Sequence, residues 1–276
     1  MPKPWTLTEK EQFHSDLRRL YIVDNLSIRE VGERLGLAEQ TIYKRLIRLG
    51  IPIQRHLKKG FNNTTRRVTL PSVYTPLVAE FFGVMLGDGH INQTQVTVTL
   101  GTKEEEYVLY VVSLIRQIFT TEASVFLKKS IISDSKYRMV YFGSVRAVRW
   151  LVSEGLVYNK VKSQVDVPKW IFSRPEFIKA FLRGFFDTDG SVYALRFGIQ
   201  ISLTNHSVPI LHSLHAMLTT LGYSPSAISG YRLYLTKRNE VKHFFSDVKP
   251  ANPKHQRRFA EFQKRVGTQA VNEGRL

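Results

Sequence analysis

Two Asp-Gly pairs close similar stretches of this 276-residue sequence, and carboxylates placed in this way can hold a metal ion. The first stretch runs from Phe82 to Gly89 and the second from Leu182 to Gly190, so Asp88 and Asp189 occupy matching places. If the stretches are paired helices, both carboxylates emerge at negative helix C-termini and repel each other. A cation relieves that repulsion, and oxygen ligands combined with a substrate phosphate suit Mg²⁺. Metal-bound water loses a proton readily and attacks phosphorus, which predicts phosphodiester hydrolysis.

Small residues inside each stretch predict how the aspartates come together. Gly83 and Gly87 are four positions apart, as are Gly184 and Thr188, so one stripe of each helix carries almost no side chain. Two such stripes allow a close backbone-to-backbone approach of the helices. We therefore expect the two helices to pack along these stripes and to end side by side.

The ends of both helices are also predicted. Thr75 precedes a proline and predicts the start of the first helix, while Ser173 and Glu176 form a capping-box pattern at the start of the second. Gly89 and Gly190 are expected to end the helices in the left-handed conformation.

The two stretches belong to an internal duplication that sets the fold class. The elements predicted in the first copy are a strand at 90–100, a helix at 103–119, strands at 124–129 and 137–142, and a helix at 145–156. Those in the second are a strand at 193–204, a helix at 207–221, strands at 227–230 and 231–237, and a helix at 239–248. The sequence thus predicts an α+β fold with two αββαββα repeats, at 73–171 and 172–265, preceded by an all-α domain at 1–50 and a linker at 51–72 and followed by a tail at 266–276.

The two stretches that end in Asp88-Gly89 and Asp189-Gly190 resemble the LAGLIDADG motifs of single-chain homing endonucleases. The similarity covers roughly residues 73–265. The resemblance implies a pseudo-twofold pair of repeats whose antiparallel sheets saddle double-stranded DNA, acting as a monomer. It also implies that Asp88 and Asp189 are catalytic acids that bind Mg²⁺, or another divalent cation such as Mn²⁺, together with Gly87 and Thr188.

The first motif departs from the family pattern at Leu86, where the sixth position usually carries Asp, whereas the second motif keeps Asp187 there. This position more often serves capping or packing than chemistry. The same fold also occurs without DNA cleavage in some RNA-splicing maturases and transcription regulators. A DNA- or RNA-binding protein that does not cut therefore stands as the alternative to the endonuclease.

A lysine-containing segment lies near the end of each repeat, after its last predicted helix. In this family a lysine in that location borders the metal site, where an ammonium offsets charge on the phosphate. The resemblance makes Lys162 and Lys254 the candidates, with Lys160 as a rival for the first.

Composition indicates a polyanionic partner. The chain has 40 Lys and Arg against 23 Asp and Glu, a formal net charge of +17. It has no cysteine, so a metal must be held by oxygen or imidazole ligands. The longest apolar run is too short for a membrane span, and residues 1–10 have no apolar signal core. We expect an intracellular protein bound to DNA, and not one embedded in an intein, since the chain starts at Met1 without splicing-domain flanks.

Alternation along the strands predicts which residues read DNA, because outward Gln and Arg can pair with bases in the major groove. The apolar residues expected to face inward are Val96, Val98, Leu100, Leu195, Phe197, Ile199, Ile201, Leu203, Leu233 and Leu235. The residues expected to face DNA are Gln93, Gln95, Thr97, Thr99, Arg196, Gln200, Ser202, Thr204, Arg232 and Tyr234.

The N-terminal domain resembles a helix-turn-helix. Ser27 and Glu30 form a capping box, Gly36 marks a tight turn, and residues 39–49 form a second helix. Its exposed side is expected to enter a groove through Gln40, Tyr43, Lys44, Arg45 and Arg48. The linker is expected to follow the DNA backbone through Arg55, Lys58, Lys59, Arg66 and Arg67.

Overall fold

The computed structural model describes residues 6–24, 26–51, 68–130, 135–195 and 198–273. They fall into two compact units, Met1–Thr65 and Arg66–Leu276. Each unit has its own apolar core, and the two are treated separately below. The predicted linker residues Arg55, Lys58, Lys59, Arg66 and Arg67 lie outside the described residues.

The first unit is all helical. It contains α1 (Leu7–Arg18), a π-helical turn η1 (Arg19–Val23), α2 (Ile28–Leu35) and α3 (Glu39–Arg48). The predicted capping box is present, because the Ser27 hydroxyl accepts from the Glu30 N–H at 3.2 Å and the Glu30 carboxylate accepts from the Ser27 N–H at 2.8 Å. Gly36 turns the chain between α2 and α3 with a φ of 66°. The core is formed by Phe13, Leu17, Leu20, Tyr21, Val31, Ile42, Leu46 and Ile51.

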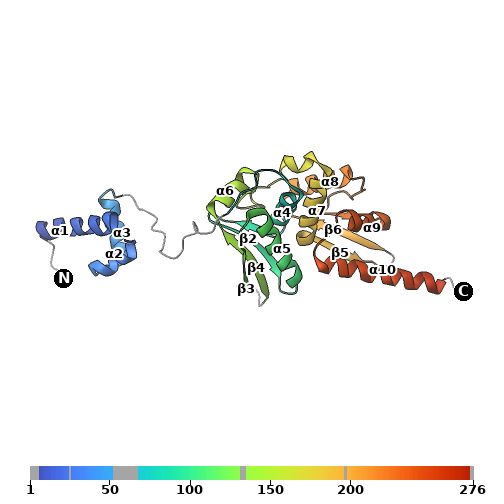
Figure 1. Cartoon of the computed structure of the whole chain (residues 1–276), viewed down its shortest axis with the longest axis horizontal. Coiled ribbons are helices and arrows are strands. Elements are labelled where there is room, and N and C mark those ends of the chain that lie inside the picture. The colour runs from blue at the N-terminus through green and yellow to red at the C-terminus, as the bar shows by residue number, and fades with distance from the viewer. Residues whose placement is uncertain (1–5, 25, 52–67, 131–134, 196–197, 274–276) are drawn as a thin grey trace. The chain divides into compact units, whose positions relative to one another are not determined.

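The second unit is built around two adjacent helices, α4 (Pro76–Leu86) and α7 (Pro175–Asp189) (Figure 1). A Cβ added to Gly83 would lie 2.2 Å from the Phe181 carbonyl oxygen, and one on Gly184 would lie 2.1 Å from the Glu80 carbonyl oxygen. The helices are therefore in backbone contact along the predicted small-residue stripes. Only glycine permits this separation at both positions.

A buried ion pair joins the same two helices. The carboxylate of Glu80, only 1% exposed, accepts from the Arg183 guanidinium at 3.2 Å and from the Tyr110 hydroxyl. Arg183 also donates to the Val248 carbonyl at 2.9 Å. Burial raises the pKa of Glu80, while the Tyr110 hydrogen bond and the Arg183 charge counteract that rise.

The first repeat follows the predicted αββαββα order. After α4 it contains β1 (Gly89–Ile91), β2 (Gln95–Gly101), α5 (Glu105–Phe119), β3 (Ser124–Lys129), β4 (Lys136–Gly143) and α6 (Val145–Ser153). The strands form an antiparallel sheet in the order β1-β2-β4-β3. The predicted single strand at 90–100 is a hairpin, because Thr94 donates to the Asn92 side chain in a tight turn between β1 and β2.

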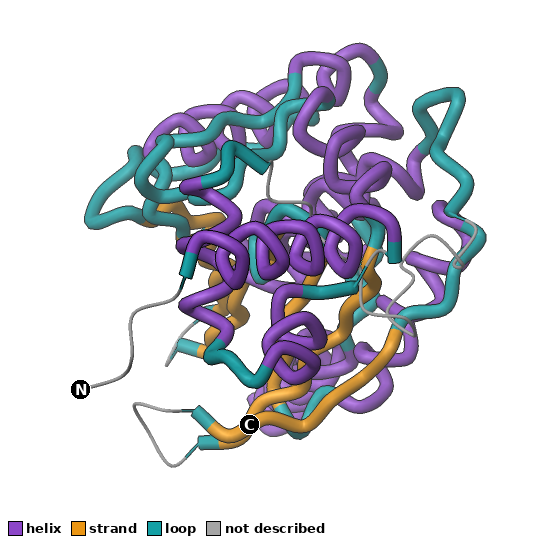
Figure 2. Tube along the Cα trace, turned by 90° about the vertical axis from the view of Figure 1, so that its left-hand side faces the viewer, coloured by secondary structure: helices purple, strands orange, loops and turns teal. Residues whose placement is uncertain are grey.

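The second repeat has one strand fewer. The 3₁₀ turn η2 (Lys169–Ser173) leads into α7, which is followed by β5 (Gly190–Ala194), β6 (Ile199–Thr204), α8 (Val208–Thr220), β7 (Arg232–Leu235), α9 (Arg238–Asp247) and α10 (Pro253–Glu273). The sheet order is β5-β6-β7, all antiparallel. Figure 2 shows the strands of the chain in orange and the helices in purple. The segment 193–204, predicted as one strand, is again a hairpin. The strand predicted at 227–230 is absent.

Local backbone conformation explains the missing strand. Gly230 and Tyr231 are consecutive left-handed residues, with φ of 54° and 61°, so the chain reverses between Ser229 and Arg232. Two adjacent positive φ values are typical of a tight hairpin turn. The segment 227–230 therefore enters the turn before β7 and pairs only at a single bridge.

Two helix-end predictions are corrected by the structure. Ser173 does not cap α7, because its hydroxyl donates to the Trp170 carbonyl at 2.7 Å within η2 and Arg174 takes the N-cap position. Gly190 is extended, with φ −88° and ψ 160°, and Gly89 has no positive φ either. These glycines are required by close packing instead, since an added Cβ would lie 2.4 Å from Met85 Cα or 2.2 Å from the Phe186 ring.

The unit boundaries differ from those expected. Ile51 belongs to the first core and Val68 to the second, although both fall in the predicted linker at 51–72. The Thr69 N–H also donates to the Phe119 carbonyl at 3.0 Å. At the other end, α10 continues through most of the segment predicted as a tail at 266–276.

The glycine contacts give a stability prediction. We expect Gly184→Ala to lower the free energy of unfolding by ~1–3 kcal/mol or more, because the new methyl group meets helix backbone that cannot move aside. Urea unfolding followed by circular dichroism measures the loss. Gly198→Ala is the matched control, because nothing lies within 4 Å of its Cβ position. Equal stability of the two variants would contradict the backbone contact.

Candidate active site

Asp88 and Asp189 lie together where α4 and α7 end, as the small-residue stripes predict. Asp189 is the last residue of α7, and Asp88 follows the Gly87 cap of α4. Burial raises the pKa of Asp189 to about 7, and the nearby negative charge of Asp88 adds to the rise. Burial also raises the pKa of Asp88. The site therefore holds two partly buried carboxylates whose charges oppose one another.

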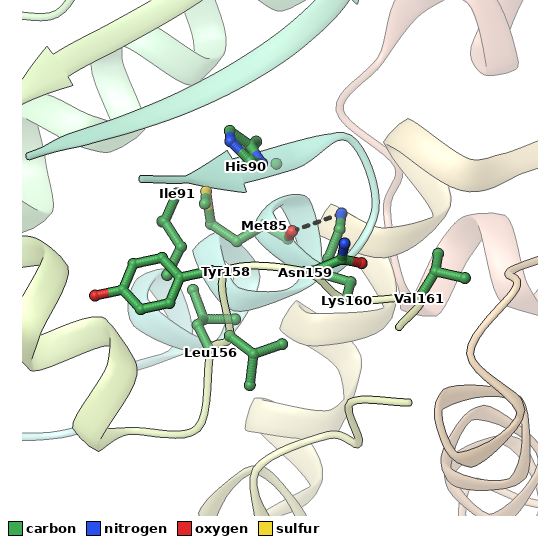
Figure 3. A pocket seen from close by; sticks show the side chains of 10 residues that line it. Met85, His90, Ile91, Leu156, Tyr158, Asn159, Lys160 and Val161 are labelled. Carbon is green, nitrogen blue, oxygen red and sulfur yellow. Dashed lines mark hydrogen bonds between the residues drawn. The ribbon is translucent and has the colours of Figure 1, made fainter. Parts of the chain in front are cut away.

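Lys160, and not Lys162, reaches these aspartates. The Lys160 ammonium donates to the carbonyl oxygens of Met85, Leu86 and Gly87 at the C-terminus of α4, where a cation is favoured by the helix dipole. Figure 3 shows this side chain directed toward the Met85 carbonyl. The Lys162 side chain is exposed instead. The rival candidate is thus the residue that the fold brings to the site.

A small pocket adjoins Lys160. It has a volume of about 260 Å³ and is lined by the end of α4, by β1 and by residues 156–161 (Figure 3). Burial lowers the pKa of Lys160, while the charges of Asp189 and Asp88 counteract that fall. The ammonium thus stands beside open space at the edge of the carboxylate pair.

Lys254 approaches the pair from the other repeat. Its ammonium forms an ion pair with Glu104 at 2.6 Å, and its positive charge lowers the pKa of both Asp88 and Asp189 against the effect of burial. The candidate catalytic lysine of the second segment is therefore located near the aspartates, with a carboxylate partner that the sequence analysis did not foresee.

Asp187 holds the segment that carries Lys254. Its carboxylate is fully buried and accepts from the Ala251 N–H at 2.8 Å and the Asn252 N–H at 3.0 Å. Burial raises the pKa of Asp187 to about 8, and these two hydrogen bonds counteract the rise. The corresponding Leu86 of the first motif is buried among apolar residues. The sixth motif position therefore serves packing and positioning.

Three polar residues around the aspartates escaped the sequence analysis. Asn205 donates to the Asp189 carboxylate at 2.9 Å, and Asn252 donates to both Glu104 and the Asp187 carbonyl at 3.0 Å. Glu104 and Asn205 each lie in the connection that leads from a hairpin to the next helix. Their matching places in the two copies of the duplication could have marked them as site residues. A polar residue just before a helix is, however, ordinarily interpreted as a helix cap.

The donors at this site fit a divalent cation that prefers oxygen. Asp88 and Asp189 supply two carboxylates, and Mg²⁺ commonly takes its remaining ligands from phosphate and water. The Gly87 carbonyl accepts from Lys160, and the Thr188 hydroxyl donates back to the Gly184 and Phe185 carbonyls at 3.0 Å, so this hydroxyl is directed into its own helix. Among the described residues, no group of three or more His, Asp and Glu side chains is arranged to hold a metal.

The sheets present most, but not all, of the residues predicted to face DNA. Val96, Val98, Leu100, Ile199, Ile201, Leu203, Leu233 and Leu235 are buried as expected. Thr99 and Arg232 are exposed, and Gln95, Gln200, Thr204 and Tyr234 are partly exposed. Gln93 is exposed in the turn between β1 and β2, outside the strands. Arg196 and Phe197 lie outside the described residues.

Two residues of the predicted outward face are shielded from solvent, and one residue predicted to face inward is exposed. Thr97 and Ser202 are only 7% and 3% exposed, because each is short and lies on the middle of a sheet between larger neighbours, Tyr141 in one case and Tyr234 in the other. Leu195 was expected to face inward but is 50% exposed, since it follows the last residue of β5.

Strand register also identifies residues that the sequence analysis missed. Cross-strand partners share a face, so Tyr141 and Met139 lie on the face of Thr97 and Thr99, and Tyr193 lies on that of Gln200. These aromatic and flexible side chains widen the outward surface of each sheet.

In the first unit, Gln40, Tyr43, Lys44 and Arg48 are exposed along α3 as expected. Arg45 is different, because its guanidinium lies over the Phe13 ring of α1 at 5.7 Å and the residue is half buried. Arg45 therefore contributes to packing within this unit.

Comparison with known proteins identifies the fold family. Residues 176–249, which include all but the first residue of α7 and the site aspartate Asp189, match the family model described as a LAGLIDADG-like domain. The chain contains a LAGLIDADG-like domain. The match confirms the resemblance for the second motif, and the backbone contact between α4 and α7 is consistent with a two-motif arrangement.

Curated relatives match segments of this chain. A replication factor C small subunit of Methanocaldococcus jannaschii is 30% identical over 50% of the chain and 7% of its own length. A glutamine–fructose-6-phosphate aminotransferase of the same organism is 23% identical over 68% of the chain, and a component of the A-type ATP synthase of Pyrococcus abyssi is 25% identical over 60%. The chain spans only 16% of each of the latter two.

Solved structures that show similarity to this chain include the homing endonuclease I-WcaI bound to its DNA recognition sequence, with a TM-score of 0.49, 11% identity, and coverage of 75% of this chain and 95% of the other. I-DmoI in complex with DNA and Mn gives 0.43, 13% identity, and 63% and 96% coverage. The N-terminal LAGLIDADG domain of WhiA gives a TM-score of 0.45, 15% identity, and coverage of 63% of this chain and 80% of the other.

No helix within the described ranges is long and apolar enough to cross a membrane.

The raised pKa of Asp189 predicts a linked effect of pH and metal on stability. Because the folded-state pKa of about 7 exceeds the unfolded value, the stability conferred by the protonated form is present at low pH and is lost as pH rises through 7. Without divalent cations, Asp189→Asn should therefore have a higher thermal midpoint than the parent protein at pH 8, and the difference should vanish near pH 4.

Added Mg²⁺ should raise the midpoint of the parent protein at pH 8 and leave that of Asp189→Asn unchanged, because metal binding requires the carboxylate. Differential scanning calorimetry measures both effects. Asp24→Asn, an exposed position in the first unit, is the control and should behave like the parent protein. A variant that still responds to Mg²⁺ would exclude Asp189 as a ligand.

Proposed function

We propose that this chain is a site-specific DNA endonuclease that hydrolyses both strands of a long, asymmetric double-stranded target. The observation that carries the proposal is the pairing of Asp88 with Asp189 between two basic side chains, Lys160 and Lys254, at the junction of two related repeats. The chain's net charge of +17 supports a nucleic acid as the substrate.

The carboxylates of Asp88 and Asp189 would hold a divalent cation, with Mg²⁺ the expected ion and Mn²⁺ a substitute. When bound, such an ion acidifies water and stabilises the leaving oxygen. Asn205 orients Asp189 by its hydrogen bond at 2.9 Å. Lys160 and Lys254 offset negative charge on the phosphate, because an ammonium on a flexible stem can follow the reacting group.

The target should lack palindromic symmetry, and the chain should act as a monomer. One repeat presents a four-stranded sheet and the other a three-stranded sheet, and their outward residues differ. Dimeric readers, in contrast, use identical surfaces on mirrored half-sites.

The comparisons with curated relatives support an independent module. The three relatives have unrelated names, and the matched segment occupies between 7% and 16% of each. A segment shared among such different proteins supports an activity of its own.

Substitution of either aspartate should separate cutting from binding. Asp88→Asn or Asp189→Asn should abolish double-strand cleavage while leaving DNA affinity near or above that of the parent protein, since each removes a metal ligand and a charge that repels phosphate. A plasmid library with randomised inserts, digested with Mg²⁺ and sequenced at its ends, measures cleavage and finds the site. Gel shifts on the recovered target measure binding.

Lys162→Ala is the control for these variants, because its side chain is exposed and should leave the cleavage rate unaltered. Normal linearisation by Asp88→Asn or Asp189→Asn would refute the site. Specific binding without any cleavage by the parent protein would instead favour the regulator, and preference for an intron RNA would favour the maturase.

We further propose that the first unit adds affinity on one flank of the target. A protein comprising residues 66–276 should bind DNA more weakly than the full chain, with a shallower salt dependence, because each lost phosphate contact reduces the log-log slope by roughly 0.9. It should still cut the same bond when enzyme is in excess, since Asp88 and Asp189 both lie in the second unit. Footprinting and salt titration test this. Identical footprints and slopes would assign the first unit another partner.

A further inference from the structure

The two lysines at the site have partners of opposite kinds. The Lys254 ammonium forms an ion pair with the Glu104 carboxylate at 2.6 Å, and both side chains are largely shielded from solvent. The Lys160 ammonium contacts only the neutral carbonyl oxygens of residues 85–87 and forms no ion pair with any residue in the described part of the chain. Lys254 therefore has a carboxylate partner in an ion pair, whereas Lys160 is hydrogen-bonded only to neutral carbonyl groups, with the charges of Asp189 and Asp88 nearby.

Several hydrogen bonds fix Glu104 in this place. The Gly101 N–H donates to one carboxylate oxygen at 2.7 Å, and the Asn252 amide donates to the other at 3.0 Å. Asn252 is itself held by Asp187 at the end of α7. The ion pair with Lys254 is thus part of a connected network, which makes it stronger than an exposed surface pair.

The second repeat has no such acid in the corresponding connection. The segment between β6 and α8 carries Asn205, a neutral residue whose amide donates to Asp189, so this connection supplies no carboxylate to pair with Lys160. The two halves of the site therefore have similar aspartates but different net charges. A phosphate near Lys254 must compete with Glu104, whereas a phosphate near Lys160 meets a cation bound only to carbonyl groups.

We propose that Glu104 is a positioning residue that withholds Lys254 from the DNA phosphate, so the two halves cut their strands at unequal rates and the half served by Lys160 acts first. This inference rests on the proposed endonuclease function. Cleavage should accordingly pass through a nicked intermediate in which the same strand is always the one broken.

Strand-resolved cleavage of an end-labelled target at saturating Mg²⁺ tests the assignment. Glu104→Gln should accelerate cutting of the slower strand by about tenfold and leave the faster strand unaltered, because Lys254 is released toward the phosphate. In a Lys254→Ala background the same change should have no effect. A slower strand that is unaffected or further slowed, or an acceleration that persists without Lys254, would overturn the proposal.

The salt dependence of DNA binding gives a readout that does not require cleavage. Release of Lys254 adds one phosphate contact, so Glu104→Gln should steepen the log-log slope by roughly 0.9 and should not do so in Lys254→Ala. Glu122→Gln is the matched control, because it removes one acid and releases Arg116 near the far end of α5, about 18 Å from Glu104 along the helix.

These outcomes distinguish the two proposals. A chain that never cuts DNA would refute the endonuclease, yet its binding slope would still report whether Glu104 restrains Lys254. A slope that Glu104→Gln leaves equal to that of the Glu122→Gln control would overturn the inference, whether or not the parent protein cuts DNA.

Discussion

Direct backbone contact between α4 and α7 is the constraint on which the rest of the second unit depends. Gly83 and Gly184 allow the two helices to approach until carbonyl oxygens of one occupy the space that a Cβ atom of the other would need. This closeness brings Asp88 and Asp189 within electrostatic reach of each other. Larger side chains at these glycines would move the helices apart, and the two carboxylates with them. The same glycine contacts therefore determine both the packing of the helices and the geometry of the site.

Charge balance at the helix ends follows from that contact. Two carboxylates at negative helix termini repel each other. One lysine from each repeat, Lys160 or Lys254, lies near them and offsets their charge. The segments that deliver these lysines also cross between repeats, because Asn252 donates to Glu104 of the first repeat and Gln164 donates to the His206 carbonyl of the second. Each half of the site is thereby completed by residues from the other half.

The sequence was sufficient for the paired helices, the duplicated α+β order and the location of the two aspartates, because glycine spacing and strand alternation report local geometry directly. It failed where a side chain acts at long range. Lys160 and Lys162 differ by only two positions, and only the fold decides which reaches α4. The burial of Thr97 and Ser202 and the Glu104–Lys254 pair likewise depend on neighbours distant in sequence. The left-handed conformations of Gly230 and Tyr231 form a turn where the duplication had predicted a strand at 227–230.

The Glu80–Arg183 pair makes the two motif helices chemically different from each other. Glu80 lies eight positions before Asp88, and the residue eight positions before Asp189 is Phe181, so the two motif helices are not interchangeable. If α4 of one molecule docked against α4 of another, two carboxylates would enter an apolar interface without a guanidinium, at a cost of ~3–5 kcal/mol for each unpaired charge. The pair therefore discourages dimers in which the first repeats of two chains pack on each other through α4. A first repeat is favoured to close on a second repeat and not on another copy of itself.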